Sequence, residues 1–377
     1  MKSFIRLFLV LAVIALLAFV YWQRQPHAAK IREEDVENAT VPASMDGTHP
    51  CVYATVMGEK MVTGVGDCAM PTEPHDAVDR FEADLRYGGF VVRQTDLQIK
   101  DVFDVPLTRT YFSEDWISSN QDHAFGFNTN HPYDVAPVGS RYPYTYLMLV
   151  LEDGDMLYFG RISKGTSFAD AVYMHTETST KFYGATIAWN GNGWTLRRRD
   201  GVQIVFPEAY MSKSLAQGAA YEISDAKGDK LVLQRDEQRN LQQIKTPHGH
   251  WIRFQYSGMH ITQAEDDGGK WTKYGYNGEG MLAYAVHDSG AERHYEYDGR
   301  LMTSVTDENG RELVHNWYQD GRLARQTFAN GDSYEYSYIS APRRFDAVSV
   351  DITMPDHSSK RLNVAGSVPG WVRAAGN

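Results

Sequence analysis

The sequence predicts a mainly β protein: an antiparallel meander of hairpins that continues into a curled sheet of repeated hairpins, with one N-terminal membrane helix. Tyrosine and glycine are abundant, at 23 and 32 of 377 residues, and this combination favours strands joined by tight turns. Runs of alternating apolar and polar residues stand between glycine turns. A pattern of glycine and aromatic residues also returns at a period of about 20 residues.

Size and charge limit the classes of function. A chain of 377 residues, 42% of them hydrophobic, is long enough to bury cores in two or three ordinary domains. Its formal net charge is −11, with acidic residues spread along the chain. Such a surface opposes the neutralisation of phosphates, so we expect no nucleic-acid partner.

The N-terminal segment, residues 1–24, is predicted to be a signal anchor or a signal peptide. Lys2 and Arg6 precede an apolar run from Leu7 to Trp22, which is longer than most cleaved signal cores and shorter than the about 20 residues of a comfortable span. We prefer an uncleaved anchor, because aromatic residues end the run and no cleavage signal follows directly. The cleaved peptide remains the alternative.

A polar linker, residues 25–44, follows this segment and carries a cluster of charged residues. The expected location is the inner (cytoplasmic) membrane, with the body in the periplasm or outside the cell. If the segment is cleaved, the protein is secreted instead.

Cys51 and Cys68 are the two cysteines of the chain. The sequence between them alternates as strands do, and a hairpin centred between Glu59 and Lys60 places the cysteines opposite each other, within the distance that a disulfide requires. An exported chain favours this disulfide. Two reduced thiols in a cytosolic domain are the alternative.

The next part, residues 45–225, is predicted to be an N-terminal β domain. Glycine turns such as those at 190–193 and 200–201 stand between alternating segments, which is the strongest short-range signal for hairpins. The predicted strand-rich stretches are "TDLQIKDVFDVPLTRTYFS", "YLMLVLEDGDMLYF" and "KFYGATIAWNGNGWTLRRRDGVQIVF". They form a meander of hairpins and not a βαβ unit.

A repeat occupies residues 226–340. Its glycines recur at steps of 21, 20, 21, 20 and 21 residues, at Gly228, Gly249, Gly269, Gly290, Gly310 and Gly331. Five residues after the last five glycines come Phe254, Tyr274, Tyr295, His315 and Tyr336. Seven residues after them come Tyr256, Tyr276, Tyr297, Trp317 and Tyr338. A spacing of two puts both rings of a unit on one face of a strand, so the rings can stack as a ladder across neighbouring hairpins.

Each repeat is predicted to be one hairpin. A strand with two aromatic residues is followed by a glycine turn, a second short strand and another turn, as in "YEYDGRLMTSVTDENG". A lone hairpin cannot bury its apolar face, so the repetition supplies the neighbour that each hairpin lacks. Residues 341–377 are predicted to be a closing strand and tail.

The repeated residues resemble those of the RHS, or YD-repeat, family, which includes bacterial rearrangement-hotspot proteins, shell subunits of insecticidal toxins and animal teneurins. The resemblance extends from about Asp96 to Tyr338 and includes "VPLTRTYFS" and "GWTLRRRDGVQIVF" upstream of the repeats. It implies a curled antiparallel sheet of stacked hairpins.

This chain departs from the long members of that family. The members that build a closed cocoon have many more repeats, followed by a self-cleaving core and a toxin domain. Here the tail after Tyr338 contains neither an Asp-Pro-x-Gly-type core nor room for an enzyme domain. We therefore expect a short, membrane-anchored member of the cell envelope without a toxin domain.

No catalytic or metal-binding residues and no cofactor are predicted. His248 and His250 are two residues apart but straddle a turn and lack a third ligand at a motif spacing. His131 and Asp134 could form an acid–base pair, yet their segment is also an ordinary loop. The stretches "DENG" and "DDGG" lack the spacing of a calcium loop and are interpreted as turns.

The expected function is a non-enzymatic scaffold or recognition module that binds an envelope protein or a glycan. Two alternatives remain: one piece of a split toxin-delivery shell, and an unrecorded hydrolase. The ladder rings either pack the core or face a groove and stack on sugars. The candidate binding residues are Tyr256, Tyr274, Tyr276, Tyr295, Tyr297, Trp317, Tyr336 and Tyr338.

Overall fold

The computed structural model describes residues 53–56, 59–62, 82–102, 104–113, 122–140, 144–152, 156–176, 181–209, 212, 214–340 and 347–364. Contacts divide the chain into two units, residues 1–74 with 341–345 and residues 75–340 with 346–377. The predicted membrane segment and the linker lie outside the described residues. Among the described residues, no helix has the length and apolar character of a membrane span.

The described residues of the first unit form one antiparallel hairpin, Tyr53–Val56 (β1) and Glu59–Val62 (β2). Val56 pairs with Glu59, so the chain reverses between these two residues. The predicted turn between Glu59 and Lys60 was therefore wrong, because the two-residue connection contains Gly58, a residue that tight turns favour. Cys51 and Cys68 lie outside the described residues, and their disulfide stays a prediction.

The second unit contains a large antiparallel sheet in which each of 21 strands, from β8 to β28, pairs with the next along the chain. Its first half consists of Ala136–Gly139 (β8), Tyr146–Val150 (β9), Met156–Arg161 (β10), Val172–Met174 (β11), Thr186–Trp189 (β12), Gly193–Arg197 (β13), Gln203–Pro207 (β14), Glu222–Ser224 (β15), Lys230–Arg235 (β16) and Leu241–Lys245 (β17). The second half consists of Trp251–Ser257 (β18), His260–Asp266 (β19), Trp271–Tyr276 (β20), Leu282–His287 (β21), Glu292–Asp298 (β22), Leu301–Asp307 (β23), Glu312–Gln319 (β24), Arg322–Phe328 (β25), Ser333–Ser340 (β26), Ala347–Thr353 (β27) and Ser359–Asn363 (β28).

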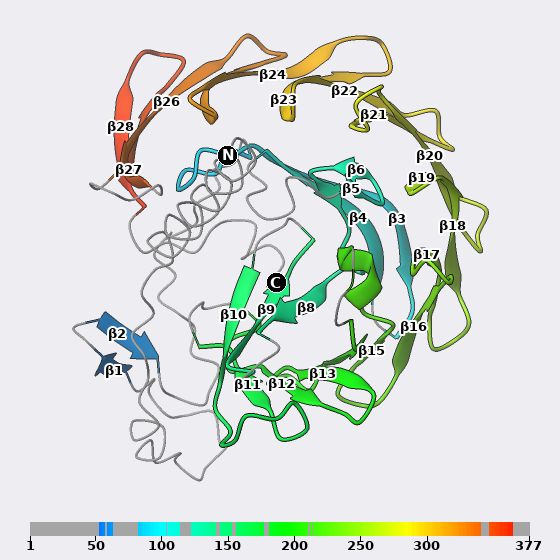
Figure 1. Cartoon of the computed structure of the whole chain (residues 1–377). Helices are drawn as coiled ribbons and strands as arrows, with labels where there is room; N and C mark the ends of the chain where they lie inside the picture. Colours follow the sequence, from blue (N-terminus) through cyan, green and yellow to red (C-terminus); the bar gives the residue numbers. More distant parts are fainter. Residues whose placement is uncertain are drawn as a thin grey trace, which may run out of the picture. The chain divides into compact units, whose positions relative to one another are not determined.

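A smaller layer precedes the large sheet in the sequence. It contains a three-stranded sheet, Val91–Lys100 (β3), Asp104–Phe112 (β4) and Thr129–Asn130 (β7), and a short hairpin, Asp122–His123 (β5) and Gly126–Phe127 (β6). A 3-10 turn, Leu215–Gly218 (η1), is the one helical element among the described residues. The large sheet curves, and β3 to β6 lie on the inner side of the curve (Figure 1).

The predicted hairpins are confirmed. Strands β12, β13 and β14 pair in succession across the turns at 190–193 and 200–201, and each repeat forms a hairpin, as in the pairing of β22 with β23. All six periodic glycines have positive φ, between 73° and 94°, which a residue without Cβ adopts at little cost.

The sheet is continuous across the predicted boundaries. Residue 225 lies between β15 and β16, which pair with each other. After the predicted repeats, residues 347–363 add a hairpin, β27 and β28, and not a single closing strand.

The core lies on the inner face of the curved sheet. Along β20, Thr272 and Tyr274 are buried and Lys273 is exposed, which is the alternation of a sheet with one covered face. The smaller layer docks on this face through its backbone: the amide of Ile261 donates to the carbonyl oxygen of Ala124 at 2.8 Å, and that of Leu323 to Gly88 at 2.7 Å.

Replacement of Gly126 tests this docking. A Cβ at Gly126 would lie 2.3 Å from the carbonyl oxygen of Gly280, and its φ is +86°. We expect Gly126→Ala to lower the free energy of unfolding by about 2–4 kcal/mol, measured by denaturant unfolding. Gly290→Ala is the matched control, since its φ is +84° and nothing lies near its Cβ; it should cost only about 1 kcal/mol. Equal losses in the two variants would contradict the docking.

Candidate functional site

The aromatic ladder faces the inner side of the sheet. Phe254, Tyr274, Tyr295 and Tyr336 are buried in the core. The rings two positions later, Tyr256, Tyr276, Tyr297 and Tyr338, are partly buried and pack against the same core. These rings are therefore packing residues, and their predicted contact with a ligand stays a prediction that burial does not favour.

A β-bulge in each repeat explains how the second tyrosine is used. Strands β19, β21 and β23 each contain one extra residue next to the residue that lies opposite the second tyrosine. These extra residues are Thr262, Ala283 and Thr303. A bulge disrupts the ladder of hydrogen bonds locally and leaves a carbonyl group that needs another donor.

The tyrosine of the following hairpin supplies that donor. The hydroxyl groups donate to a main-chain carbonyl about 15 residues earlier, in four pairs: Tyr256 to Leu241 at 2.8 Å, Tyr276 to Ile261 at 2.7 Å, Tyr297 to Leu282 at 2.9 Å and Tyr318 to Met302 at 2.9 Å. Burial raises the pKa of these four tyrosines well above the ordinary value, so each hydroxyl keeps its proton. Each hairpin is thus bonded to the one before it.

Trp317 does not belong to the inner ladder, and its predicted placement with the tyrosines was wrong. An additional bulge at Leu313, between the pairs Val305–Val314 and Thr306–Glu312, reverses the direction of the side chains that follow. Trp317 is 42% exposed, and Tyr318 takes the inner position. The glycine spacing indicates this change. The next glycine after Gly310 comes eleven residues later, at Gly321, and not nine residues later as in other repeats.

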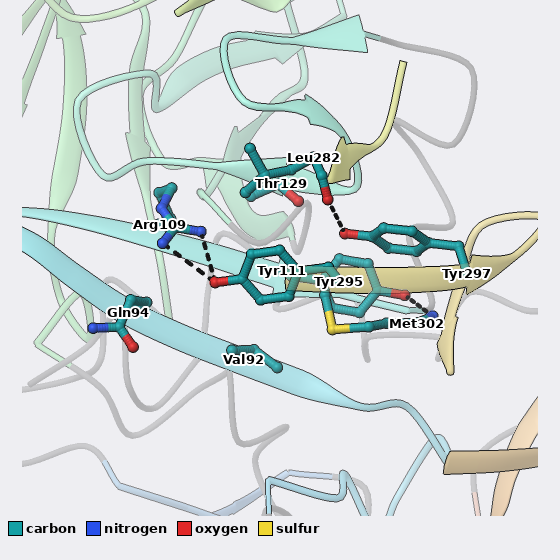
Figure 2. A pocket seen from close by; sticks show the side chains of 9 residues that line it. All are labelled: Val92, Gln94, Arg109, Tyr111, Thr129, Leu282, Tyr295, Tyr297 and Met302. Atoms are coloured by element: carbon teal, nitrogen blue, oxygen red, sulfur yellow. Dashed lines mark hydrogen bonds between the residues drawn. The ribbon is translucent and has the colours of Figure 1, made fainter. Parts of the chain in front are cut away.

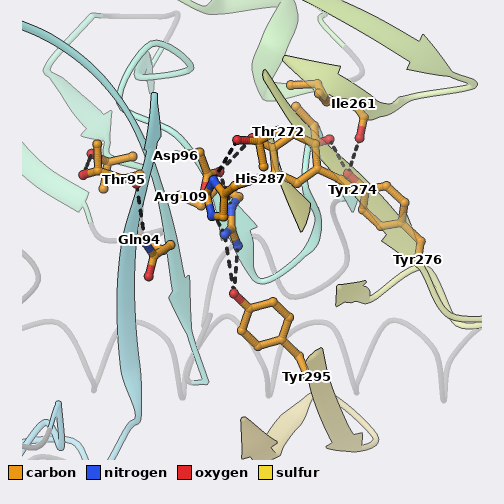
Figure 3. Close-up of polar contacts among 12 residues, drawn as sticks. Gln94, Thr95, Asp96, Arg109, Ile261, Thr272, Tyr274, Tyr276, His287 and Tyr295 are labelled. Carbon is orange, nitrogen blue, oxygen red and sulfur yellow. Dashed lines mark hydrogen bonds and ion pairs between the residues drawn. The ribbon is translucent and has the colours of Figure 1, made fainter. Parts of the chain in front are cut away.

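A buried ion pair joins the smaller layer to the repeats. Arg109 on β4 contacts Asp96 on β3 through two nitrogen–oxygen pairs, at 2.5 and 2.9 Å, and both side chains are almost fully buried. The hydroxyl of Tyr274 donates to the same carboxylate at 2.7 Å, and the guanidinium of Arg109 lies against the rings of Tyr274 and Tyr295 (Figure 3).

The backbone of β3 and the charge of Asp96 both favour this cluster. Asp96 is the bulge residue of the β3–β4 pairing, and this directs its side chain toward Arg109. Burial alone would lower the pKa of Arg109, but the charge of Asp96 raises it well above the ordinary value. Burial, together with Asp96, raises the pKa of Tyr274. Arg109 therefore stays charged beside Asp96, and the hydroxyl of Tyr274 stays a hydrogen-bond donor, so the cluster stabilises the fold.

A small cavity lies beside this cluster. Figure 2 shows that its lining includes Arg109, Tyr111, Leu282, Tyr295 and Met302. Its volume is about 10 Å³, which is space for about one water molecule. The cavity is too small to hold an organic ligand.

His131 and Asp134 are brought together, with 3.6 Å between Nε2 and the carboxylate. Both are buried, and Arg235 donates to Asp134 at 2.8 Å. Burial lowers the pKa of His131 to about 4, and its ring stacks on Phe254. Burial would raise the pKa of Asp134, but the charges of His131 and Arg235 lower it. The arrangement stabilises the loop before β8, and both side chains are buried there.

His248 and His250 do not share a site. His248 contacts Asp101, and Nδ1 of His250 lies 2.6 Å from Asp267. The hydrogen bond to Asp267 raises the pKa of His250. No group of three or more potential metal ligands occurs in the described part of the chain.

The ion pair of Asp96 and Arg109 was not predicted from the sequence. The available signal was a pair of opposite charges in two strands of one predicted hairpin. The outward-facing Trp251 and Trp271, the first residues of β18 and β20, were not predicted either. These two residues come two positions after a repeat glycine, which was a usable signal.

Comparisons with known proteins give similarity of structure alone. No family model and no curated protein matches the chain. Among solved structures, it is similar to a Photorhabdus luminescens Tc holotoxin pore, at 13% identity and a TM-score of 0.30, over 72% of this chain and 18% of that one.

Two further structures show the same level of similarity. TcdB2–TccC3 without its hypervariable C-terminal region gives 13% identity and a TM-score of 0.31, over 72% and 19% of the two chains. TcdB2–TccC3–Cdc42 gives 13% and 0.30 over the same shares. The chain thus spans about a fifth of the length of these structures, and its family assignment stays a prediction from the repeat motif.

Arg109→Met tests how much the buried ion pair stabilises the fold. We expect a loss of about 3–5 kcal/mol in the free energy of unfolding, because Asp96 remains buried without its partner. Arg361→Met is the matched control: Arg361 makes a bidentate pair with Asp351, at 2.6 Å for each contact, but its side chain is 65% exposed. It should cost at most about 1 kcal/mol. A small loss for Arg109→Met would show that the pair does not hold the two layers together.

His131→Phe tests the pH dependence of stability. The pKa of His131 is about 4 in the folded chain and about 6.5 in an unfolded chain, so the unfolded state binds more protons between these values. The wild type should therefore lose stability as the pH falls through this window, by about 2 kcal/mol at pH 5 from this group. The variant should show a flatter slope in denaturant unfolding between pH 7 and 4.5. Parallel slopes would contradict the assignment.

Proposed function

We propose that the chain is a non-enzymatic recognition or scaffold module of the cell envelope, and that it belongs to the RHS-repeat type. The observation that supports this best is that the inner face of the repeat sheet is occupied by the chain's own β3 to β6. The outer face is left for a partner, which is an envelope glycan or an envelope protein.

The titratable groups favour a role without catalysis. Arg109 and His131, whose pKa values are strongly shifted, are buried and contact other parts of the chain. Shifted groups at a catalytic site face a cleft that admits a substrate. The hydrolase alternative therefore has less support.

The outer face carries aromatic side chains that the fold does not bury. Trp317 is 42% and Tyr284 is 38% exposed. The Tyr284 ring lies over Gly275, where a Cβ would be only 2.1 Å from the ring. Exposed rings on a rigid sheet are suited to contact with a partner.

A location outside the cytoplasm is part of the proposal. Its support comes from the sequence, in the apolar run of residues 7–22 and in the cysteine pair Cys51 and Cys68. The split-shell alternative has less support than a stand-alone module, since a shell wall needs a free inner face for its cargo and here the inner face is covered.

Site-specific crosslinking in cells tests the proposal. A photoreactive amino acid is placed in the full-length chain at Gln255, Glu296 or Glu335, which are exposed on β18, β22 and β26. Expected adducts contain one defined glycan or one protein, identified by mass spectrometry and competed by excess unlabelled chain. The matched control is Asp356, an exposed residue in the β27–β28 turn.

Two results would contradict the proposal. Hydrolysis of an envelope polymer by the purified chain, without adducts at the three positions, would replace recognition by catalysis. Protection of the body from protease added to spheroplasts would contradict the location outside the cytoplasm.

A further inference from the structure

The loop between β10 and β11, residues 162–171, places apolar side chains in solvent, and we call it the apolar loop. Ile162 is 39% and Phe168 is 41% exposed. The Phe168 ring lies beside two more aromatic rings, with centroid distances of 5.9 Å to Tyr144 and 4.8 Å to Trp189. Exposed apolar groups gathered in this way indicate a contact with a partner or a membrane.

Arg161, the last residue of β10, holds the apolar loop in shape. Its side chain is only 7% exposed. The guanidinium donates to the carbonyl oxygen of Ser163 at 3.1 Å and to those of Lys164 and Ser167 at 3.0 Å. It also donates to the carboxylate of Asp170 at 2.8 Å and neutralises this acid. The shape of the loop therefore comes from hydrogen bonds, and its apolar side chains are left for another contact.

Other backbone groups of the apolar loop are bonded within the loop or to β11. The amide of Ile162 donates to the carbonyl oxygen of Val172 at 2.9 Å, and the amide of Ala169 donates to the hydroxyl of Ser167 at 3.1 Å. A segment that enters a bilayer must satisfy its backbone groups internally, because lipid chains offer no hydrogen-bond partners. A protein partner brings donors and acceptors of its own and makes no such demand. The bonding of the loop therefore favours lipid over protein.

The residues beside the apolar loop are of the kind that occupies a membrane–water interface. Tyr146 is 37% exposed and lies opposite Gly160, two residues before Ile162. Tyr144 has a φ of +62°, a strained conformation for a bulky residue, and its carbonyl oxygen accepts from Arg161 at 3.3 Å. Tyrosine and tryptophan are frequent at such interfaces because each ring has an apolar body and one polar group. The same arginine thus holds the loop and the tyrosine beside it.

The charges around the apolar loop do not oppose lipid headgroups. Asp170 is paired with Arg161, and Lys164 adds an exposed cation. Glu208 follows β14 at the same end of the sheet, and its carboxylate accepts from the indole of Trp194 at 2.8 Å. Two cations and two carboxylates sum to zero, so zwitterionic and anionic headgroups are both compatible with this end of the sheet.

We propose that the apolar loop enters the lipid–water interface of a membrane, with Ile162 and Phe168 among the acyl chains below the headgroups. The choice of a membrane follows from the sequence. The apolar run of residues 7–22 precedes the body, and a chain anchored by this run stays close to a bilayer. The proposal rests on the location proposed above and adds a second contact with the same membrane.

An environment-sensitive fluorescent amino acid in place of Ile162 or Phe168 of the full-length chain tests the proposal. The chain is reconstituted in vesicles of phosphatidylethanolamine and phosphatidylglycerol, with or without phosphatidylcholine brominated on its acyl chains. Bromine quenches only fluorophores that reach the acyl chains. We expect a blue shift and about twofold or stronger quenching at both positions.

The matched control carries the same fluorophore in place of Met259, which is 50% exposed in the turn between β18 and β19. We expect no quenching there. With the fluorophore in place of Ile162, Phe168→Asp should reduce the quenching to the level at Met259, whereas Phe168→Leu should retain it. Phe168 is exposed, so both variants are expected to fold, and their thermal unfolding is compared with that of the wild type.

The results separate the lipid contact from the location. A chain that stays in the vesicles, with no more quenching at Ile162 and Phe168 than at Met259, would overturn the contact and leave the location in place. A blue shift without quenching would assign the loop to a protein contact and overturn the lipid contact. A chain that alkaline carbonate removes from the vesicles, and that shows no quenching, would contradict both.

Discussion

A curved sheet one layer thick has an inner apolar face that must be covered, and this constraint organises the molecule. The chain covers the face with its own earlier segments, whose carbonyl groups at Gly88 and Ala124 accept backbone hydrogen bonds from the repeats. The covering layer carries a charged pair, Asp96 and Arg109, into the interior. A buried pair is tolerated only when its hydrogen bonds are satisfied, so Tyr274 and Tyr295 fix the register of the two layers.

The bulges provide hydrogen bonds that connect neighbouring repeats. Each one leaves a carbonyl group that the tyrosine of the next hairpin bonds, so neighbouring hairpins are connected by side chains as well as by their backbone pairs. Where an extra bulge falls at Leu313, Asn316 and Tyr318 face the inner side in place of His315 and Trp317. The side-chain amide of Asn316 donates to the carbonyl of Met302 at 3.0 Å and accepts from Gln326 at 3.1 Å, and these bonds satisfy the buried polar groups.

The two faces of the sheet therefore have different roles. The inner face is used for the chain's own stability, and its tyrosines are held by hydrogen bonds and packing. The outer face retains tryptophans and cations at a step that the strands impose. We expect any recognition by this protein to depend on the outer face, which does not carry the tyrosines of the repeat motif.

The mainly β class, the hairpin repeats and the phase of their turns could be predicted from the sequence, because glycine turns and alternation act over a few residues. The sequence also predicted that rings such as Tyr274 and Tyr295 share a face. Which face is covered could not be predicted, since this depends on β3 and β4, which lie far from the repeats in the sequence. One residue in a bulge reverses all following side chains. The longer interval from Gly310 to Gly321 indicates a change of register near Trp317, but it does not locate the bulge, and spacing does not show the bulge that turns Asp96 toward Arg109.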